Sequence, residues 1–222
     1  MQNLIDYWPL MMQGLRVTLT LAVSTVVVGL ILGMLLALAK LSSRPWLSRP
    51  AFALTNLLRG IPEFLVLLLI YYGGSQVLGW LFGGGDVSPF LAGLIALSLV
   101  FGAYSSETFR GAFKSVPKGQ IEAGRAYGFT AWQCFRLIEL PQIWKVAIPG
   151  LGNLWQGTVK DTALVSVVGL DDLMRKSNQA AQSTREPFNF YLFAALIFLL
   201  ITVVSMIIIA QLEKRASRGV RR

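Results

Sequence analysis

A few charged side chains lie within the hydrophobic segments of this sequence, and their chemistry is the most informative. An ionised group inside a membrane costs roughly 2.5 to 3.5 kcal/mol, so such groups pair with one another or face a water-filled cavity. In the pairing hypothesis Glu107 binds Arg110, one helical turn away, and Lys160 binds a neighbouring carboxylate. In the pathway hypothesis, polar side chains line a route for a solute near the middle of the membrane: Glu107, Asn153, Gln156, Lys160, Asp161 and Ser166.

The residue types that catalysis most often uses are scarce. The sequence has no histidine and one cysteine, Cys134, which excludes an internal disulfide, a Cys/His zinc site and a histidine-based triad. It also lacks the glycine-rich Walker A motif that cradles ATP phosphates. We therefore expect no catalytic residue, metal site or cofactor in this chain. A membrane enzyme that uses Glu107, Lys160 and Asp161 as acids and bases is a remote alternative, as is a carrier that works without ATP.

The elements that position these groups are hydrophobic helices. The chain has 222 residues, of which 55% are hydrophobic and 14% charged, as is typical of a membrane protein. Apolar stretches near 17–39, 54–78, 90–113 and 190–212 are long enough to span a bilayer. A fifth, near 143–170, is interrupted by proline, glycine and polar residues and should face protein or water. The sequence predicts one all-α polytopic domain, residues 1–222, with five transmembrane helices.

The basic residues predict its orientation. The net charge is +9, and the loops that follow the first, third and fifth spans hold most of the 20 lysines and arginines. Cytoplasmic loops carry an excess of such residues, so we expect a periplasmic N-terminus and a cytoplasmic C-terminus. This bias explains the positive charge without binding to nucleic acid.

Residues 114–141 form a loop on the same predicted cytoplasmic side. Residues 119–127 favour a short helix, which Gly128 can end in the left-handed conformation. Thr130 and Gln133 can form a capping box at the start of a second helix, and Pro141 marks the next boundary. Ala123, Gly124 and Ala126 make the first helix slim, while Glu122 and Arg125 offer charges. A short helix of this kind needs a partner, which favours docking on a protein over the alternative of lying on the bilayer surface.

The spacing of this loop resembles the signature of ATP-binding-cassette (ABC) importer permeases. That pattern is Glu-Ala-Ala, three residues, Gly, nine residues, Ile, one residue and Leu-Pro. The sequence keeps every spacing from Glu122 to Leu140 and Pro141, with Gly124 in place of the second alanine. The resemblance implies the type I importer permease fold. It also implies that residues 119–130 are a coupling helix docked on a separate ATPase subunit, which binds ATP and Mg. The candidate coupling residues are Glu122, Ala123, Gly124, Arg125, Gly128, Leu140 and Pro141.

Four further segments resemble the polar amino acid branch of these permeases: residues 59–63, 107–112, 151–155 and 160–166. They are most similar to the arginine and histidine permeases of Gram-negative bacteria. This resemblance implies a permease for basic amino acids (arginine, histidine or lysine) in the bacterial inner membrane. Its implied partners are a related but different second permease, an ABC ATPase dimer and a periplasmic amino-acid-binding protein. Glutamine, glutamate and opines remain alternative substrates.

Overall fold

The computed structural model describes residues 2–82 and 85–217, and these residues are almost entirely helical. The elements are α1 (Gln2–Asp6), α2 (Trp8–Leu41), α3 (Pro45–Gly60), α4 (Glu63–Phe82), α5 (Pro89–Lys114), α6 (Lys118–Ala126), α7 (Ala131–Cys134), the π-helical η1 (Phe135–Glu139), α8 (Leu140–Asp161), the 3-10 helix η2 (Thr162–Val168), α9 (Leu173–Thr184) and α10 (Pro187–Ser217).

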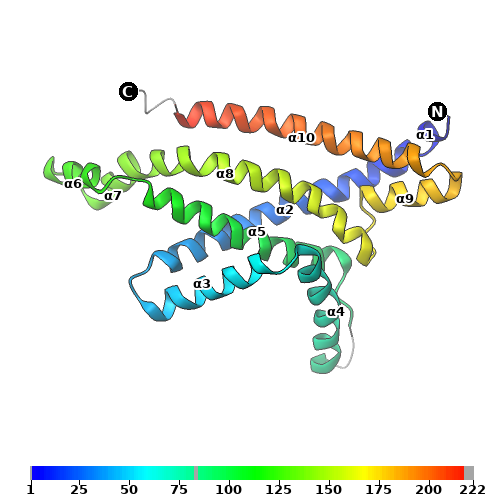
Figure 1. Cartoon of the computed structure of the whole chain (residues 1–222), viewed down its shortest axis with the longest axis horizontal. Coiled ribbons are helices and arrows are strands. Elements are labelled where there is room, and N and C mark those ends of the chain that lie inside the picture. The colour runs from blue at the N-terminus through cyan, green and yellow to red at the C-terminus, as the bar shows by residue number, and fades with distance from the viewer. Residues whose placement is uncertain (1, 83–84, 218–222) are drawn as a thin grey trace.

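The body of the molecule is an elongated bundle in which α2, α5, α8 and α10 lie side by side (Figure 1). The closest packing joins α2 to α5, where glycines allow the backbones to approach. A Cβ on Gly29 would lie 2.5 Å from Cδ1 of Phe101, and one on Gly102 would lie 3.0 Å from Cβ of Leu32. Small residues serve the same purpose in other membrane helix pairs. The N-terminus lies at one end of this bundle, and α6, α7 and the C-terminal end of α10 lie at the other.

Four helices of the described residues are long and apolar enough to cross a membrane: α2, α4, α5 and α10. They correspond to the predicted spans 17–39, 54–78, 90–113 and 190–212. The fifth predicted span, 143–170, corresponds to α8 and η2, of which α8 packs between α5 and α10 but is less apolar. The all-helical prediction is confirmed, whereas the count of five transmembrane helices stays a prediction.

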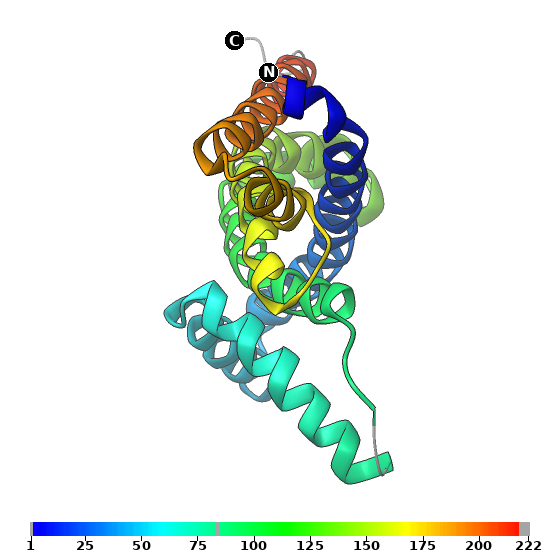
Figure 2. The same cartoon turned by 90° about the vertical axis from the view of Figure 1, so that its right-hand side faces the viewer.

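The second predicted span is interrupted in the structure. Helix α3 ends at Gly60, and Ile61 adopts an extended conformation before Pro62. Proline disfavours the helical conformation in the residue before it, which explains this break inside an otherwise hydrophobic stretch. Helix α4 begins at Glu63 and projects away from the bundle (Figure 2). The break therefore places Glu63 at the base of a projecting arm.

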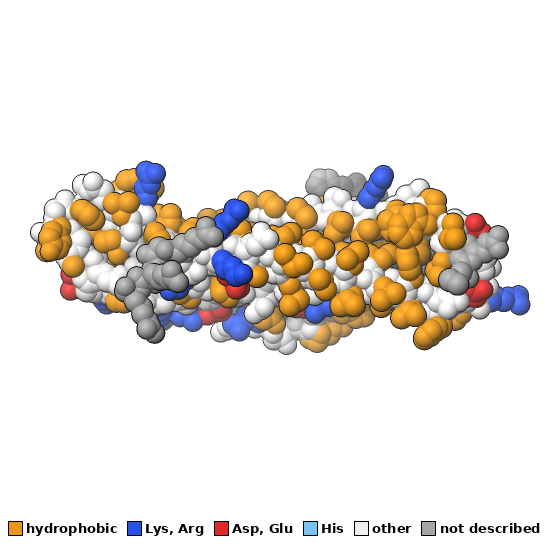
Figure 3. Space-filling model, turned by 90° about the horizontal axis from the view of Figure 1, so that it is seen from above, with side chains coloured by type: hydrophobic (Ala, Val, Ile, Leu, Met, Phe, Trp, Pro, Cys, Tyr) orange, Lys and Arg blue, Asp and Glu red, His pale blue; other side chains and the backbone are white. Residues whose placement is uncertain are grey.

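The outside of the bundle carries many large hydrophobic side chains. Figure 3 shows hydrophobic side chains gathered over the middle of the face formed by α10. Large exposed side chains of this helix include Leu196, Leu199, Leu200 and Val203. Exposed leucine and valine along one helix face are expected where lipid or another membrane helix covers the surface.

Candidate functional site

The loop between α5 and α8 folds into the two short helices that the sequence predicts. Helix α6 covers Lys118–Ala126, against a predicted 119–127, and Gly128 has a left-handed φ of +86°. The hydroxyl of Thr130 accepts a hydrogen bond from the Gln133 amide at 3.3 Å, and the Gln133 side chain accepts one from the Thr130 amide at 2.8 Å. The predicted capping box is therefore confirmed.

One member of the predicted coupling set faces inward. Glu122, Ala123, Arg125 and Gly128 are exposed, but Gly124 is buried. A Cβ on Gly124 would lie 2.7 Å from Cδ1 of Ile138 and 3.2 Å from Sγ of Cys134. Gly124 therefore does not lie on the exposed surface of α6, and its role in coupling stays a prediction. Its lack of a side chain lets α6 pack against α7 and η1, so it shapes the loop from within.

Pro141 lies at the boundary that the sequence predicts, where the π-helical η1 is followed by α8. Pro141 does not end the helix, since α7, η1 and α8 follow one another without a gap from Ala131 to Asp161. The Leu140 amide instead bonds to the carbonyl of Phe135, five residues back. This wider π turn accommodates a proline whose ring would clash with an ordinary helical carbonyl. The loop is consequently joined to α8 by continuous helix.

Two aromatic side chains that the sequence reasoning did not select stand out on the same loop. Tyr127 is 87% exposed and Trp132 is 64% exposed. Both flank the Gly128 turn, next to the exposed face of α6. Large aromatic side chains are enriched at protein interfaces. The occurrence of two of them in an otherwise polar, basic loop was the feature of the sequence that could have identified them as contact residues.

Glu107 belongs to an ion cluster at the end of the bundle that carries α6 and α7. Its Oε2 accepts a hydrogen bond from Nε of Arg110 at 2.9 Å, which confirms the predicted pair. Its Oε1 accepts a second from Nζ of Lys40 at 2.7 Å, and Lys40 also donates to the Ser106 hydroxyl at 2.8 Å. Both cations lie over the ring of Phe52, at 5.4 and 5.7 Å. The cluster ties α2 and α3 to α5.

Asp161 and Asn153 line a second, acidic site. They share a cavity of about 150 Å³ between α4, α5 and α8 with Glu63, Tyr104 and Thr158. Glu63 of α4 and Asp161 of α8 line this cavity together. The sequence reasoning missed Glu63, because only the break at Pro62 and the projection of α4 bring it opposite Asp161. Over the described part of the chain, its lining holds the carboxyl groups of Glu63 and Asp161 and no lysine or arginine, so it suits a positively charged group.

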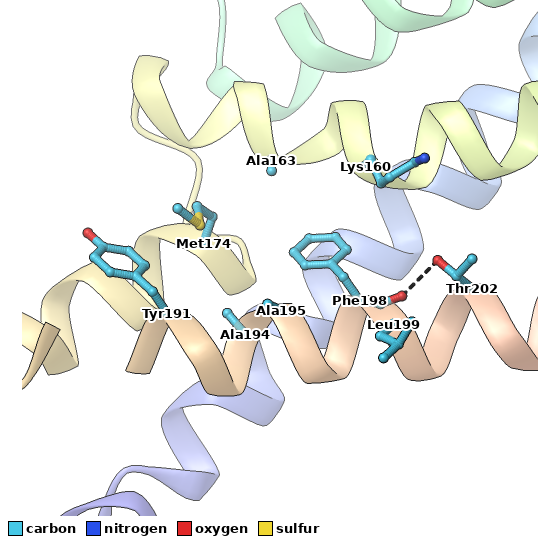
Figure 4. Close-up of a pocket in the computed structure, with 9 residues that line it drawn as sticks. All are labelled: Lys160, Ala163, Met174, Tyr191, Ala194, Ala195, Phe198, Leu199 and Thr202. Atoms are coloured by element: carbon cyan, nitrogen blue, oxygen red, sulfur yellow. Dashed lines mark hydrogen bonds between the residues drawn. The ribbon is translucent and has the colours of Figure 1, made fainter. Parts of the chain in front are cut away.

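The remaining pathway candidates lie elsewhere. Lys160 lines a wider groove formed with α10 rather than the acidic cavity (Figure 4). Ser166 is in η2, where its hydroxyl donates to the carbonyl of Ala163 at 2.7 Å. Gln156 is partly buried in α8 and lines neither space. Among the described residues Lys160 has no carboxylate within 4 Å, so the structure does not form its predicted pair. Four of the six candidates therefore separate into an ion cluster, a cavity and a groove, whereas Gln156 and Ser166 lie in none of the three.

Comparison with known proteins agrees with this geometry. Residues 29–218 match the family described as binding-protein-dependent transport system inner membrane component. The chain is 44% identical to the histidine/lysine/arginine/ornithine transport system permease protein HisQ of Escherichia coli, over 95% of each chain. It is 45% identical to the octopine permease OccQ of Rhizobium radiobacter, over 96% of this chain and 92% of that protein.

Similar solved structures extend the agreement to the fold. An amino acid ABC transporter crystallised with histidines contains a chain that is 33% identical, with a TM-score of 0.86 over 96% of this chain and 97% of that one. The MetNI methionine transporter shares the fold at 20% identity, with a TM-score of 0.70 over 91% and 96% of the two chains. The chain therefore belongs to the family of inner membrane components of binding-protein-dependent transport systems, the permease subunits of ABC importers, in which a separate subunit hydrolyses ATP.

Proposed function

We propose that this chain imports basic amino acids, such as arginine, histidine and lysine, across the bacterial inner membrane. The observation that carries the proposal is the acidic cavity at Glu63 and Asp161. Relatives named for histidine, lysine, arginine and ornithine, or for arginine alone, support it. The octopine permeases, equally similar in sequence, keep an opine as the second candidate substrate.

The cavity offers two kinds of contact to a cationic solute. The carboxyl groups of Glu63 and Asp161 can accept hydrogen bonds from an ammonium or guanidinium group. The Asn153 amide can bond to either a carboxylate or an amine, while the ring of Tyr104 already lies under the Arg59 guanidinium, at 5.2 Å. Because Glu63 lies on α4 and Asp161 on α8, a movement between these helices would change the affinity of the cavity for its solute.

The coupling residues provide the link to ATP. In this proposal α6 docks on an ATPase dimer that binds ATP and Mg, with Glu122, Ala123 and Arg125 at the contact and Gly128 setting the turn. Gly124, Leu140 and Pro141 support the loop from inside. The continuous helix from Ala131 to Asp161 would carry a displacement of the loop directly to the acidic cavity.

The full assembly adds a second permease, a related but different chain, and a periplasmic amino-acid-binding protein. The N-terminus lies in the periplasm, and the C-terminus and α6 lie in the cytoplasm. The positions of the basic residues support this orientation, because α6 and the basic C-terminal end of α10 lie at the same end of the bundle (Figure 1).

The test is uptake into proteoliposomes that contain the complete transporter. Labelled arginine, histidine, lysine, glutamine, glutamate and octopine are compared with and without ATP. We expect ATP-dependent uptake of the basic amino acids, reduced at least tenfold by Asp161→Asn and unaffected by Asp86→Asn, which makes the same chemical change at an exposed position. Glu122→Lys should abolish coupling to ATP. Uptake that is indifferent to ATP would overturn the importer mechanism, and uptake of glutamine or octopine alone would overturn the substrate.

A further inference from the structure

A groove of about 610 Å³ opens on the outside of the bundle between the end of α8 and α10. Figure 4 shows Ala194, Phe198 and Leu199 of α10 along one wall and Lys160 of α8 on the opposite side. We call this the Lys160 groove. Apart from the lysine, its walls are almost entirely apolar, so it differs in character from the acidic cavity.

Lys160 has no acceptor for its protons among the described residues. No hydrogen bond or ion pair of its ammonium group is present, although the side chain is exposed in the groove. The adjacent Asp161 lines the acidic cavity with Glu63 instead. Two hydroxyl side chains, Tyr191 and Thr202, also line the groove, and that of Thr202 donates its own proton to the carbonyl of Phe198 at 2.8 Å (Figure 4). The positive charge of Lys160 in this groove is therefore not balanced by any group of the described residues.

The position of the groove within the membrane restricts which groups can bind the Lys160 ammonium. Helix α10 has 31 residues, from Pro187 to Ser217, and Thr202 lies at its midpoint. At 1.5 Å per residue, about 46 Å of helix crosses a hydrocarbon layer of about 30 Å. Lys160 thus lies near the middle of the membrane, where its four-carbon stem does not reach a lipid headgroup. Within the hydrocarbon region the acceptor is either another protein segment or water in a cavity, and the mostly apolar walls of the groove favour a protein segment.

We propose that the Lys160 groove receives a transmembrane helix of the second permease subunit, which supplies a carboxylate or carbonyl oxygen to the Lys160 ammonium. The proposal rests on the proposed function, which provides the second permease. Its apolar walls would pack against that helix, and the single charge would fix the helix in one register, since any other register leaves the lysine unpaired. Lys160 is then an assembly residue, while Asp161 next to it serves the solute.

The test places a photo-crosslinking amino acid at one of two adjacent leucines in the complete transporter. Leu199 is 57% exposed and lines the groove, whereas Leu200 is 63% exposed and does not. We expect irradiation to join the chain to the second permease from position 199, at least fivefold more than from position 200. Equal yields at the two positions, or adducts with lipid alone from position 199, would overturn the proposal.

A second measurement tests the charge. Lys160→Met preserves most of the length of the side chain without its ammonium group, and Lys160→Arg preserves the charge. We expect Lys160→Met to reduce the position 199 adduct and the amount of second permease that copurifies by at least threefold, with Lys160→Arg near the original level. If both variants assemble like the original chain, the second permease does not supply an acceptor to the Lys160 ammonium group, and the proposal fails. Uptake measured in the same preparations separates this proposal from the proposed transport function. A complex that transports basic amino acids but gives no adduct refutes docking in the Lys160 groove and leaves the transport function intact.

Discussion

Removing the ammonium group of Lys40 tests whether the ion cluster holds the bundle together. The Lys40 side chain is fully buried, and it bonds to both Glu107 and Ser106. Arg110 binds the same carboxylate, but its side chain is 26% exposed. We compare Lys40→Met with Arg110→Met, because the two changes remove one cation each from Glu107.

The expected magnitudes follow from burial. Removing one partner of a buried ion pair costs about 3 to 5 kcal/mol, and we take about 3 because Glu107 retains Arg110. A partly exposed pair contributes about 1 kcal/mol or less. With an unfolding entropy of roughly 2.1 cal/mol/K per residue over the 222 residues, these values correspond to decreases in Tm of about 6 °C and 2 °C.

The assay is thermal stability in detergent, followed by size-exclusion chromatography after heating. Ser106→Ala is the control for the loss of the hydrogen bond that the Lys40 ammonium donates to Ser106, and it should lower Tm by about 3 °C, in line with about 1.5 kcal/mol for a bond with one charged partner. Added salt should not change the effect of Lys40→Met, since a buried pair is screened little. A decrease for Arg110→Met that equals or exceeds that for Lys40→Met would refute the assignment of Lys40 as the main anchor.

Three further outcomes are expected. Gly128→Val should lose most ATP-driven uptake, because a branched residue at a φ of +86° adds roughly 1 to 3 kcal/mol of strain to the turn; unchanged uptake would contradict a role for the turn. Asp161→Asn should reduce transport while copurification of the ATPase stays intact, and loss of the ATPase would instead indicate a role in folding. Burial raises the pKa of Asp172, the N-cap of α9, from 3.8 to about 6. The folded chain therefore binds this proton more tightly than the unfolded chain, so stability should fall as the pH rises from about 4 through 6. Thermal unfolding at several pH values checks this, and Asp172→Asn should flatten the dependence.

The sequence predicted the elements whose causes are local. Hydrophobic runs of sufficient length predict helices wherever they lie, and the left-handed glycine at 128 and the capping box at Thr130 depend only on residues within one turn. The Glu107 and Arg110 pair was predictable for the same reason, since three residues always bring side chains together on a helix. Family membership followed from the spacing of one loop.

Only the tertiary structure decided how distant residues meet. Lys40 reaches Glu107 because α2 packs against α5. Glu63 lines the cavity of Asp161 because Pro62 breaks the second span. In neither pair are the two residues close in sequence. Lys160 and Asp161 are adjacent in the chain yet line different spaces. The physical reason is that consecutive residues on a helix point about 100° apart, so the packing of the neighbouring helices, and not sequence position, determines the chemistry that each side chain meets.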